Sequence, residues 1–187
     1  MRRLLILTLV GCASGGGGAA GSSASGSSVP DRVVLVDDRG RVYRSASATA
    51  NAAEQEIPAT AQEAVQALVG AYESLGISVN TLDWTAGRVA AMSFAAPRRL
   101  GGHAMATFFD CGLTSIGQPR ANSYAVTLNL ESVVRPGATG KVVLATHASG
   151  TARPQSVSGD PIGCTTTGQL EKLVNLRAGA RAAGGTP

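Results

Sequence analysis

The clearest hydrophobic pattern in the chain lies just after Pro58 and is that of an amphipathic helix. Apolar residues recur there at steps of three and four, which places them on one helix face: Val65, Leu68, Val69, Tyr72 and Leu75. Thr60 and Glu63 form a capping-box pattern at the start, and Gly76 stands where a left-handed cap belongs. The pattern predicts a helix from Thr60 to Leu75, with the apolar stripe in the core.

Farther along the chain, apolar and polar residues alternate in the way that is typical of antiparallel strands. The strongest case runs from Asn122 to Val134, in which one face is predicted to be buried: Tyr124, Val126, Leu128 and Leu130. Residues 135–140 predict a turn, and Lys141 to Ala152 is expected to pair back antiparallel. Shorter strands are predicted at residues 79–84 and 88–94, joined by a turn, and at residues 104–110.

Weaker signals precede and follow these elements. Residues 33–36 and 41–44 predict a β-hairpin, and residues 45–56 fit either an exposed strand or a loop. A second helix is predicted to start at Thr166, with Gln169 at the capping-box position.

The order of these elements predicts one α+β domain over residues 29–177. Its antiparallel β-sheet is expected to carry two helices packed on one face, in a helix-grip-like arrangement. Residues 178–187 are expected to form a disordered tail, because they are small, polar and terminal.

The first twelve residues carry the strongest functional signal. A basic segment, Met1-Arg2-Arg3, precedes an apolar run from Leu4 to Val10, and the motif Leu9-Val10-Gly11-Cys12 follows. This motif resembles the lipobox of bacterial lipoproteins. The resemblance implies that residues 1–11 are a signal peptide removed on processing, and that Cys12 carries a diacylglyceryl group, usually with an N-acyl chain such as palmitate. A plain signal peptide or a buried N-terminal strand is the alternative interpretation.

The segment after Cys12 is composed almost wholly of Gly, Ser and Ala up to Ser28. Such a segment cannot bury enough apolar surface to order itself, so residues 12–28 are predicted to be a flexible tether. Its root-mean-square span is roughly 20–24 Å. Ala13 is not the aspartate that retains enterobacterial lipoproteins in the inner membrane. The resemblance therefore favours an anchor in the outer membrane, facing the periplasm.

Composition and charge exclude several classes. Hydrophobic residues make up 44% of the 187 residues, which excludes full disorder, and no run of 18 apolar residues predicts a spanning helix. The net charge is +4, but removing Arg2 and Arg3 leaves 14 basic residues against 12 acidic ones. The arginines are scattered and only seven aromatic residues are present, which argues against nucleic acid as a partner.

Two cysteines remain when Cys12 is assigned to lipid. Cys111 and Cys164 are an even pair in an oxidising compartment, and we predict a disulfide between them. The chain-entropy relation gives about 4 kcal/mol for a loop of this length. The alternative, Cys111 as a nucleophile assisted by a histidine, would need a thiol that stays reduced outside the cytoplasm.

Few residues offer chemistry of other kinds. His103, His147 and Asp110 could be combined with a serine into a hydrolase set, but no Gly-x-Ser-x-Gly motif is present. Two histidines without nearby carboxylates do not predict a metal site, and no cofactor motif is found. Arg98 and Arg99 form a compact basic loop that could contact an anion or a protein partner.

A stretch of about 40 residues resembles a known family. Ile57-Pro58-Ala59-Thr60, the helix that follows, Leu75-Gly76-Ile77 and the hairpin at residues 79–94 look like the repeated domain of BamC-type lipoproteins. These are accessory proteins of the outer-membrane barrel-assembly machine with helix-grip domains. The chain departs from them in having one domain, an expected disulfide, a short last helix and no long unstructured segment after the lipid.

The sequence favours a non-catalytic binding or accessory role in the cell envelope, with an envelope protein as a possible partner. No residue is expected to be catalytic. A carrier of a small apolar ligand or lipid is the first alternative, because a sheet that grips a helix can leave a cavity. A secreted hydrolase is the second, and it would require a nucleophile and a base in contact within a cleft.

Overall fold

The computed structural model describes residues 32–36, 42–46, 52–155 and 159–185. The predicted signal peptide, Cys12 and the tether lie outside the described residues. In chain order the elements are β1 (Arg32–Val36), β2 (Val42–Ala46), β3 (Ala53–Ile57), α1 (Ala61–Ser74), β4 (Thr81–Asp83), β5 (Arg88–Ala96), β6 (Arg99–Leu100), β7 (His103–Ala104), the 3₁₀ turn η1 (Met105–Thr107), β8 (Phe109–Asp110), α2 (Arg120–Ser123), β9 (Ala125–Pro136), β10 (Val142–Arg153), β11 (Ile162–Thr166) and α3 (Gln169–Ala182).

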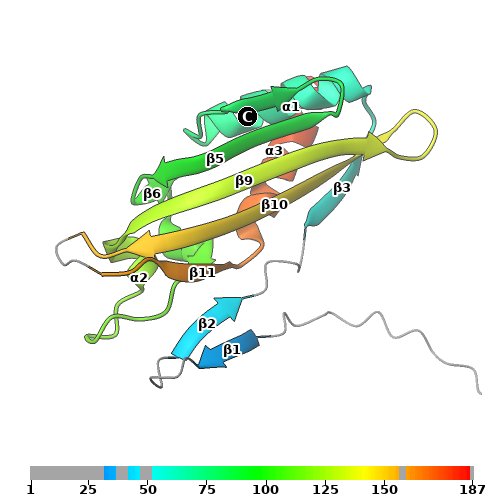
Figure 1. The fold of residues 1–187 in the computed structure, drawn as a ribbon. Coiled ribbons are helices and arrows are strands. Elements are labelled where there is room, and N and C mark those ends of the chain that lie inside the picture. The colour runs from blue at the N-terminus through cyan, green and yellow to red at the C-terminus, as the bar shows by residue number, and fades with distance from the viewer. Residues whose placement is uncertain (1–31, 37–41, 47–51, 156–158, 186–187) are drawn as a thin grey trace, which may run out of the picture.

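The long hairpin of β9 and β10 forms the centre of an antiparallel sheet (Figure 1). Within the described residues the sheet has seven strands in the order β4-β5-β9-β10-β11-β8, and β3 also pairs with β10. Strands β3 and β11 share one edge of β10, because β9 occupies the other edge along the whole hairpin. The hairpin of β1 and β2 pairs separately, as its sequence predicts.

Helices α1 and α3 lie side by side on one face of this sheet (Figure 1). The predicted α+β class, with helices packed on an antiparallel sheet, is therefore confirmed. The buried side chains between the two layers include Leu68, Leu128, Leu144, Leu170 and Val174. This interface is the hydrophobic core of the domain.

Helix α1 agrees closely with its prediction. The hydroxyl oxygen of Thr60 accepts a hydrogen bond from the Glu63 amide, and the Glu63 carboxylate accepts one from the Thr60 amide at 2.8 Å. Gly76 has a φ of +77°, and the Ile77 amide donates back to the Tyr72 carbonyl, which closes the helix end. The apolar stripe is buried except for Val69, which is only half-buried.

Strand β9 begins three residues later than predicted. Arg120–Ser123 form the short helix α2 instead, and Tyr124 is only half-buried. Val126, Leu128 and Leu130 are buried as predicted. Residues 45–56 were predicted to be either an exposed strand or a loop, and the paired strand β3 begins among them.

The predicted strand at residues 104–110 is wrong. Gly101 and Gly102 take positive φ values, which reverse the chain after two residues and produce the small hairpin of β6 and β7. Met105 and Phe108 are both buried, at the three-residue spacing of the turn η1. A strand would have buried alternate residues instead.

The boundaries of the last helix also differ from the prediction. Thr166 belongs to β11, and α3 begins at Gln169 after Gly168, whose φ of +78° excludes a helical start before it. The predicted frayed tail from residue 178 is wrong up to Ala182, where α3 ends, because Ala178 is fully buried against the core.

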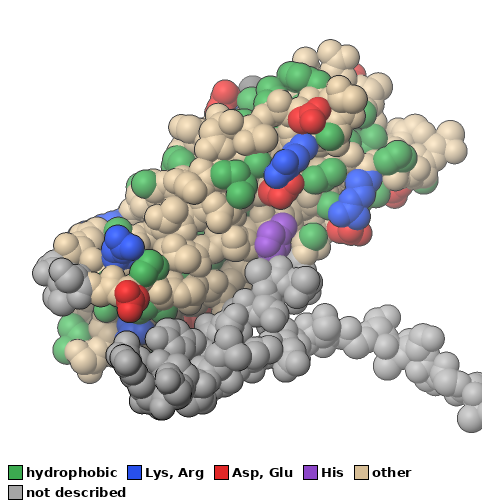
Figure 2. Space-filling model, in the orientation of Figure 1, with side chains coloured by type: hydrophobic (Ala, Val, Ile, Leu, Met, Phe, Trp, Pro, Cys, Tyr) green, Lys and Arg blue, Asp and Glu red, His purple; other side chains and the backbone are tan. Residues whose placement is uncertain are grey.

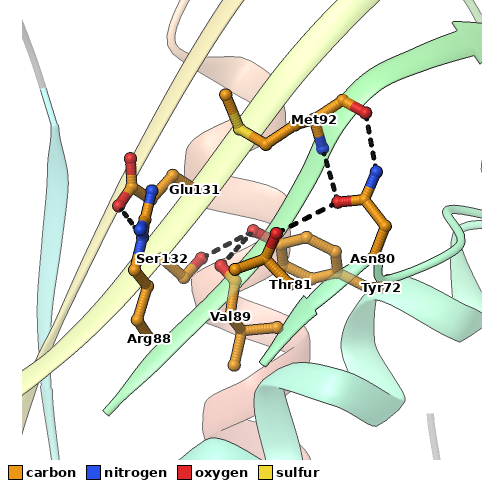
Figure 3. Close-up of polar contacts among 8 residues, drawn as sticks. All are labelled: Tyr72, Asn80, Thr81, Arg88, Val89, Met92, Glu131 and Ser132. Carbon is orange, nitrogen blue, oxygen red and sulfur yellow. Dashed lines mark hydrogen bonds and ion pairs between the residues drawn. The ribbon is translucent and has the colours of Figure 1, made fainter. Parts of the chain in front are cut away.

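A line of hydrogen-bonded polar groups crosses the core between the helices and the sheet. Tyr72 bonds Ser132 at 3.1 Å, as Figure 3 shows, and Ser132 bonds Thr146 at 2.7 Å. Thr146 donates to the side-chain oxygen of Asn175, whose amide nitrogen donates to the Ala53 carbonyl at 2.7 Å. Burial raises the pKa of the Tyr72 phenol well above its usual range. The line joins both helices to β3, β9 and β10.

The shared edge of β10 contains a short break. Strand β3 pairs up to Thr146 and β11 pairs from Gly150, so residues 147–149 have no strand partner on that edge.

Glu171 of α3 is fully buried, and its Oε1 accepts a hydrogen bond from the Thr166 hydroxyl at 2.7 Å. Within the described residues its Oε2 has no hydrogen-bond partner. Burial raises the pKa of this carboxyl, against the lowering effect of Thr166.

Candidate functional site

One end of the sheet collects basic side chains from three separate parts of the chain. We call this the arginine end: it comprises Arg98, Arg99, Arg120 and Arg153. Here β5 ends, β9 begins and β10 ends, since Ala96 pairs with Val126 and Arg153 pairs with Ala125. The loop of residues 112–118 lies at the same end of the sheet and projects from the domain beside α2 (Figure 1).

The two arginines predicted from the sequence lie on an ordered hairpin. Arg98 is exposed, and its Nη2 lies 3.4 Å from Gln155 Oε1, just beyond the end of β10. Arg99 is also exposed and donates to the Gly102 carbonyl. Leu100, the last residue of β6, is fully buried, which fixes these two arginines to the core.

Sequence reasoning missed the other two arginines. Arg153 is exposed at the last position of β10, where strand pairing brings it to the same end as Arg98. Arg120 opens α2 and is half-buried, with its guanidinium 5.9 Å from the centre of the Tyr124 ring. Its Nε is buried without a hydrogen-bond partner among the described groups. Only the sheet register reveals this grouping, because the residues are far apart in sequence.

The arginine end differs from the opposite end of the sheet in the ion pairing of its basic side chains. At the opposite end of β9 and β10, three basic side chains pair with carboxylates: Arg88 with Glu131, Arg135 with Glu54 and Lys141 with Glu56. Basic and acidic side chains lie side by side over this part of the sheet in Figure 2. Across the described residues, no carboxylate pairs with an arginine of the arginine end. At the arginine end, the described residues therefore leave the positive charge unbalanced by a contacting carboxylate.

The predicted disulfide stabilises the base of the arginine end. Cys111 follows β8 and Cys164 lies in β11, with Cα atoms 4.2 Å apart and the sulfurs bonded. This confirms the predicted cysteine pair. Asp110, next to it, accepts a hydrogen bond from the Gly112 amide at 2.8 Å, so its carboxylate is used to hold the loop. Asp160 is exposed just before β11.

The residues considered for hydrolase chemistry are not brought together. His103 is exposed and packs edge-on against Phe108, with ring centres 5.8 Å apart. His147 lies on β10 directly opposite Glu131 on β9, while Asp110 holds the Gly112 amide. In residues 52–155 and 159–185, we find no cluster of His, Cys, Asp and Glu that could hold a metal ion.

Two open depressions lie on the surface away from the arginine end. One of about 660 Å³ borders the end of α1 and β4, where Val69 and Leu82 line it. The other, of about 730 Å³, lies between the start of α1 and the turn of β9 and β10, beside the half-exposed Trp84. The space between the helices and the sheet is filled by core side chains, including Tyr72 and Phe108.

Comparisons with protein-family models, curated proteins and solved structures found no match for this chain. Of the helices in the described part of the chain, none combines the length and the apolar character needed to cross a membrane.

Proposed function

We propose that this chain is a lipoprotein of the cell envelope, anchored in the outer membrane through lipid on Cys12 and facing the periplasm. Its folded domain has a non-catalytic binding or accessory role and contacts an anionic envelope component through the arginine end. The observation that carries the proposal is the grouping of four arginines without carboxylate partners among the described residues.

The lipid anchor is supported by the lipobox-like motif that ends at Cys12 and by the composition of the tether. A flexible span of roughly 20–24 Å keeps the domain close to the membrane and free to rotate. An accessory role of the BamC type would use the same arrangement.

The binding role is supported by the chemistry of arginine. A guanidinium presents a rigid fork of donors that matches carboxylate and phosphate groups in two-point contacts. Arg98 and Arg99 are held by the buried Leu100, so little ordering would be needed when an anion binds. The filled interface between helices and sheet gives the apolar-ligand carrier no comparable support.

Labelling with a radioactive fatty acid tests the anchor. Cells that express the chain should incorporate label, and the Cys12→Ala variant should incorporate none. A Cys111→Ala variant serves as the matched control and should still be labelled. Label that persists on the Cys12→Ala variant, or label on neither protein, would contradict the anchor.

Retention on a washed envelope fraction tests the binding role. The Arg98→Gln and Arg99→Gln double variant, in the Cys12→Ala background, should be retained less than its parent. The Arg135→Gln and Lys141→Gln double variant removes the same number of positive charges from the opposite end, where these residues pair with Glu54 and Glu56, and should leave retention unchanged. Equal retention of both variants would contradict a role for the arginine end.

A further inference from the structure

The loop that joins β8 to α2 exposes two large apolar side chains. Leu113 is 59% exposed and Ile116 is 77% exposed. Single exposed apolar residues are common on soluble proteins, so exposure alone indicates little. Leu176 on α3, at 63% exposed, is such a case. What distinguishes the loop is its internal order and its position beside the arginines.

Hydrogen bonds hold the loop in a defined shape. The Thr114 carbonyl accepts from the Gly117 amide at 3.0 Å, which places Ser115 and Ile116 at the centre of a tight turn. The Thr114 amide donates to the Gln118 carbonyl at 2.8 Å, and Gly117 takes a φ of +78° that completes the turn. Ile116 is therefore presented at the tip of an ordered loop.

The base of the loop is fixed as firmly as its tip. The Arg120 amide donates to the Gly112 carbonyl at 2.9 Å, which closes the loop across its two ends. The disulfide of Cys111 joins the same point to β11. The loop thus projects from the arginine end in a preformed shape (Figure 1). Its tip carries the exposed apolar side chain of Ile116.

We infer that the arginine end docks on the anionic lipid surface of the membrane, with Leu113 and Ile116 entering the headgroup boundary and the arginines contacting lipid phosphates. This inference deepens the proposed function and depends on it, because the anchor at Cys12 brings the domain to the membrane. The arginines alone would fit a soluble anion, and the apolar tip alone would fit a protein. Apolar side chains flanked by basic ones match the two layers of a membrane interface.

The geometry of the sheet predicts which end of the domain faces the membrane. Trp84 lies on the turn between β4 and β5, near the far end of β9. About seven strand residues, or roughly 23 Å, separate that level of the sheet from the arginine end. With the arginine end on the membrane, Trp84 remains outside the lipid.

Vesicle sedimentation tests the docking with residues 12–187 in the Cys12→Ala background, so that neither the signal peptide nor lipid on Cys12 plays a part. Vesicles of phosphatidylcholine with phosphatidylglycerol should bind the protein, and vesicles of phosphatidylcholine alone should bind it weakly. Ile116→Ser should reduce the partition coefficient about tenfold or more. Arg98→Gln and Arg99→Gln should each reduce it about fivefold.

Matched controls remove the same groups elsewhere. Leu176→Ser deletes a similarly exposed apolar side chain, and Arg135→Gln deletes an arginine at the opposite end. Both should bind phosphatidylglycerol vesicles like the parent. All five positions have exposed side chains, so the variants should fold.

Moving the chain's only tryptophan tests the orientation. Trp84→Phe combined with Ile116→Trp places the fluorophore at the loop tip. Brominated phosphatidylglycerol should quench this variant strongly and should leave native Trp84 unquenched. Equal or stronger quenching of native Trp84 would overturn the inference.

Three other outcomes would also overturn the inference: equal binding to both kinds of vesicle, unchanged binding by Ile116→Ser, or full displacement by inorganic phosphate, which indicates a soluble-anion site. The proposed function would survive each of them if Cys12 is labelled and the Arg98 and Arg99 double variant loses envelope retention. Conversely, a Cys12 that takes no label would contradict the proposed anchor without changing the vesicle result.

Discussion

Ser132 on β9 and Thr146 on β10 are directly paired across the central hairpin, with their hydroxyl oxygens 2.7 Å apart in the core. Thr146 donates its proton to Asn175, so Ser132 must donate to Thr146 and can only accept from Tyr72, whose hydroxyl also lies 3.4 Å from the Val89 carbonyl. Each hydroxyl has one proton, which fixes the direction of the whole line.

Loss of either hydroxyl should therefore disturb its neighbours. Ser132→Ala and Thr146→Val should each lower the free energy of unfolding by about 1–3 kcal/mol, because a buried polar group loses its partner. The double variant should lose less than the sum of the two, with a coupling of at least about 0.5 kcal/mol in urea unfolding. Thr127→Val, at an exposed site on β9, is the control and should be nearly neutral. Additive losses would contradict the network.

Glu171 should make stability depend on pH. Because burial raises the pKa of the folded carboxyl above its ordinary value of 4.5, its contribution to stability is complete below that value. It is lost as the pH rises through the folded pKa. Glu171→Gln should therefore raise the thermal midpoint at pH 7 and leave it nearly unchanged below pH 4.5. Glu73→Gln on the exposed face of α1 should show no such difference, and a lower midpoint for Glu171→Gln at pH 7 would refute the prediction.

The disulfide should contribute substantially to stability. It closes a loop of 53 residues, for which the chain-entropy relation gives about 4 kcal/mol. Replacing Cys111 and Cys164 together by alanine should lower the free energy of unfolding by about that amount in denaturant titration. A reductant should destabilise the parent and have no effect on the double variant. A parent that is insensitive to reductant would show that the bridge contributes little.

Ser93 offers a stabilising substitution. It lies at a bulge in β5 with a φ of +54°, a conformation that costs a non-glycine residue roughly 1–2 kcal/mol. Its amide donates to Asn129 at 2.7 Å, which holds the bulge in place. Ser93→Gly should raise the free energy of unfolding by up to about 1 kcal/mol, whereas Ser149→Gly in the regular strand β10 should lower it. A destabilised Ser93→Gly variant would exclude strain at this site.

Local signals in the sequence were reliable where no competing turn or strand pairing overrides them. Helix α1 was predicted to within one residue at each end because Thr60, Glu63 and Gly76 act on neighbours three or four positions away. The start of α3 was mispredicted because Thr166, a plausible cap, is held in β11 by strand pairing.

The arginines of the candidate site differ in the same way, because some are neighbours in sequence and others are brought together only by the fold. Arg98 and Arg99 are adjacent in sequence and were found there. Arg120 and Arg153 join them only through the register of β9 and β10. Ser132 and Thr146 carried a signal that was available, since each interrupts the apolar face of its strand, but their shared partner Asn175 comes from a distant helix.

The position of the disulfide also determines how the domain responds to tension. Cys111 and Cys164 lie outside the two ends of the β9–β10 hairpin, so the covalent path through the molecule bypasses it. A force applied between the N-terminus and the C-terminus would unravel α1 and α3 without extending the hairpin. Roughly 175–190 Å of contour length stays locked within the closed loop of 53 residues. A domain pulled from its two ends would thus keep its central strands joined until the sulfur bond is reduced.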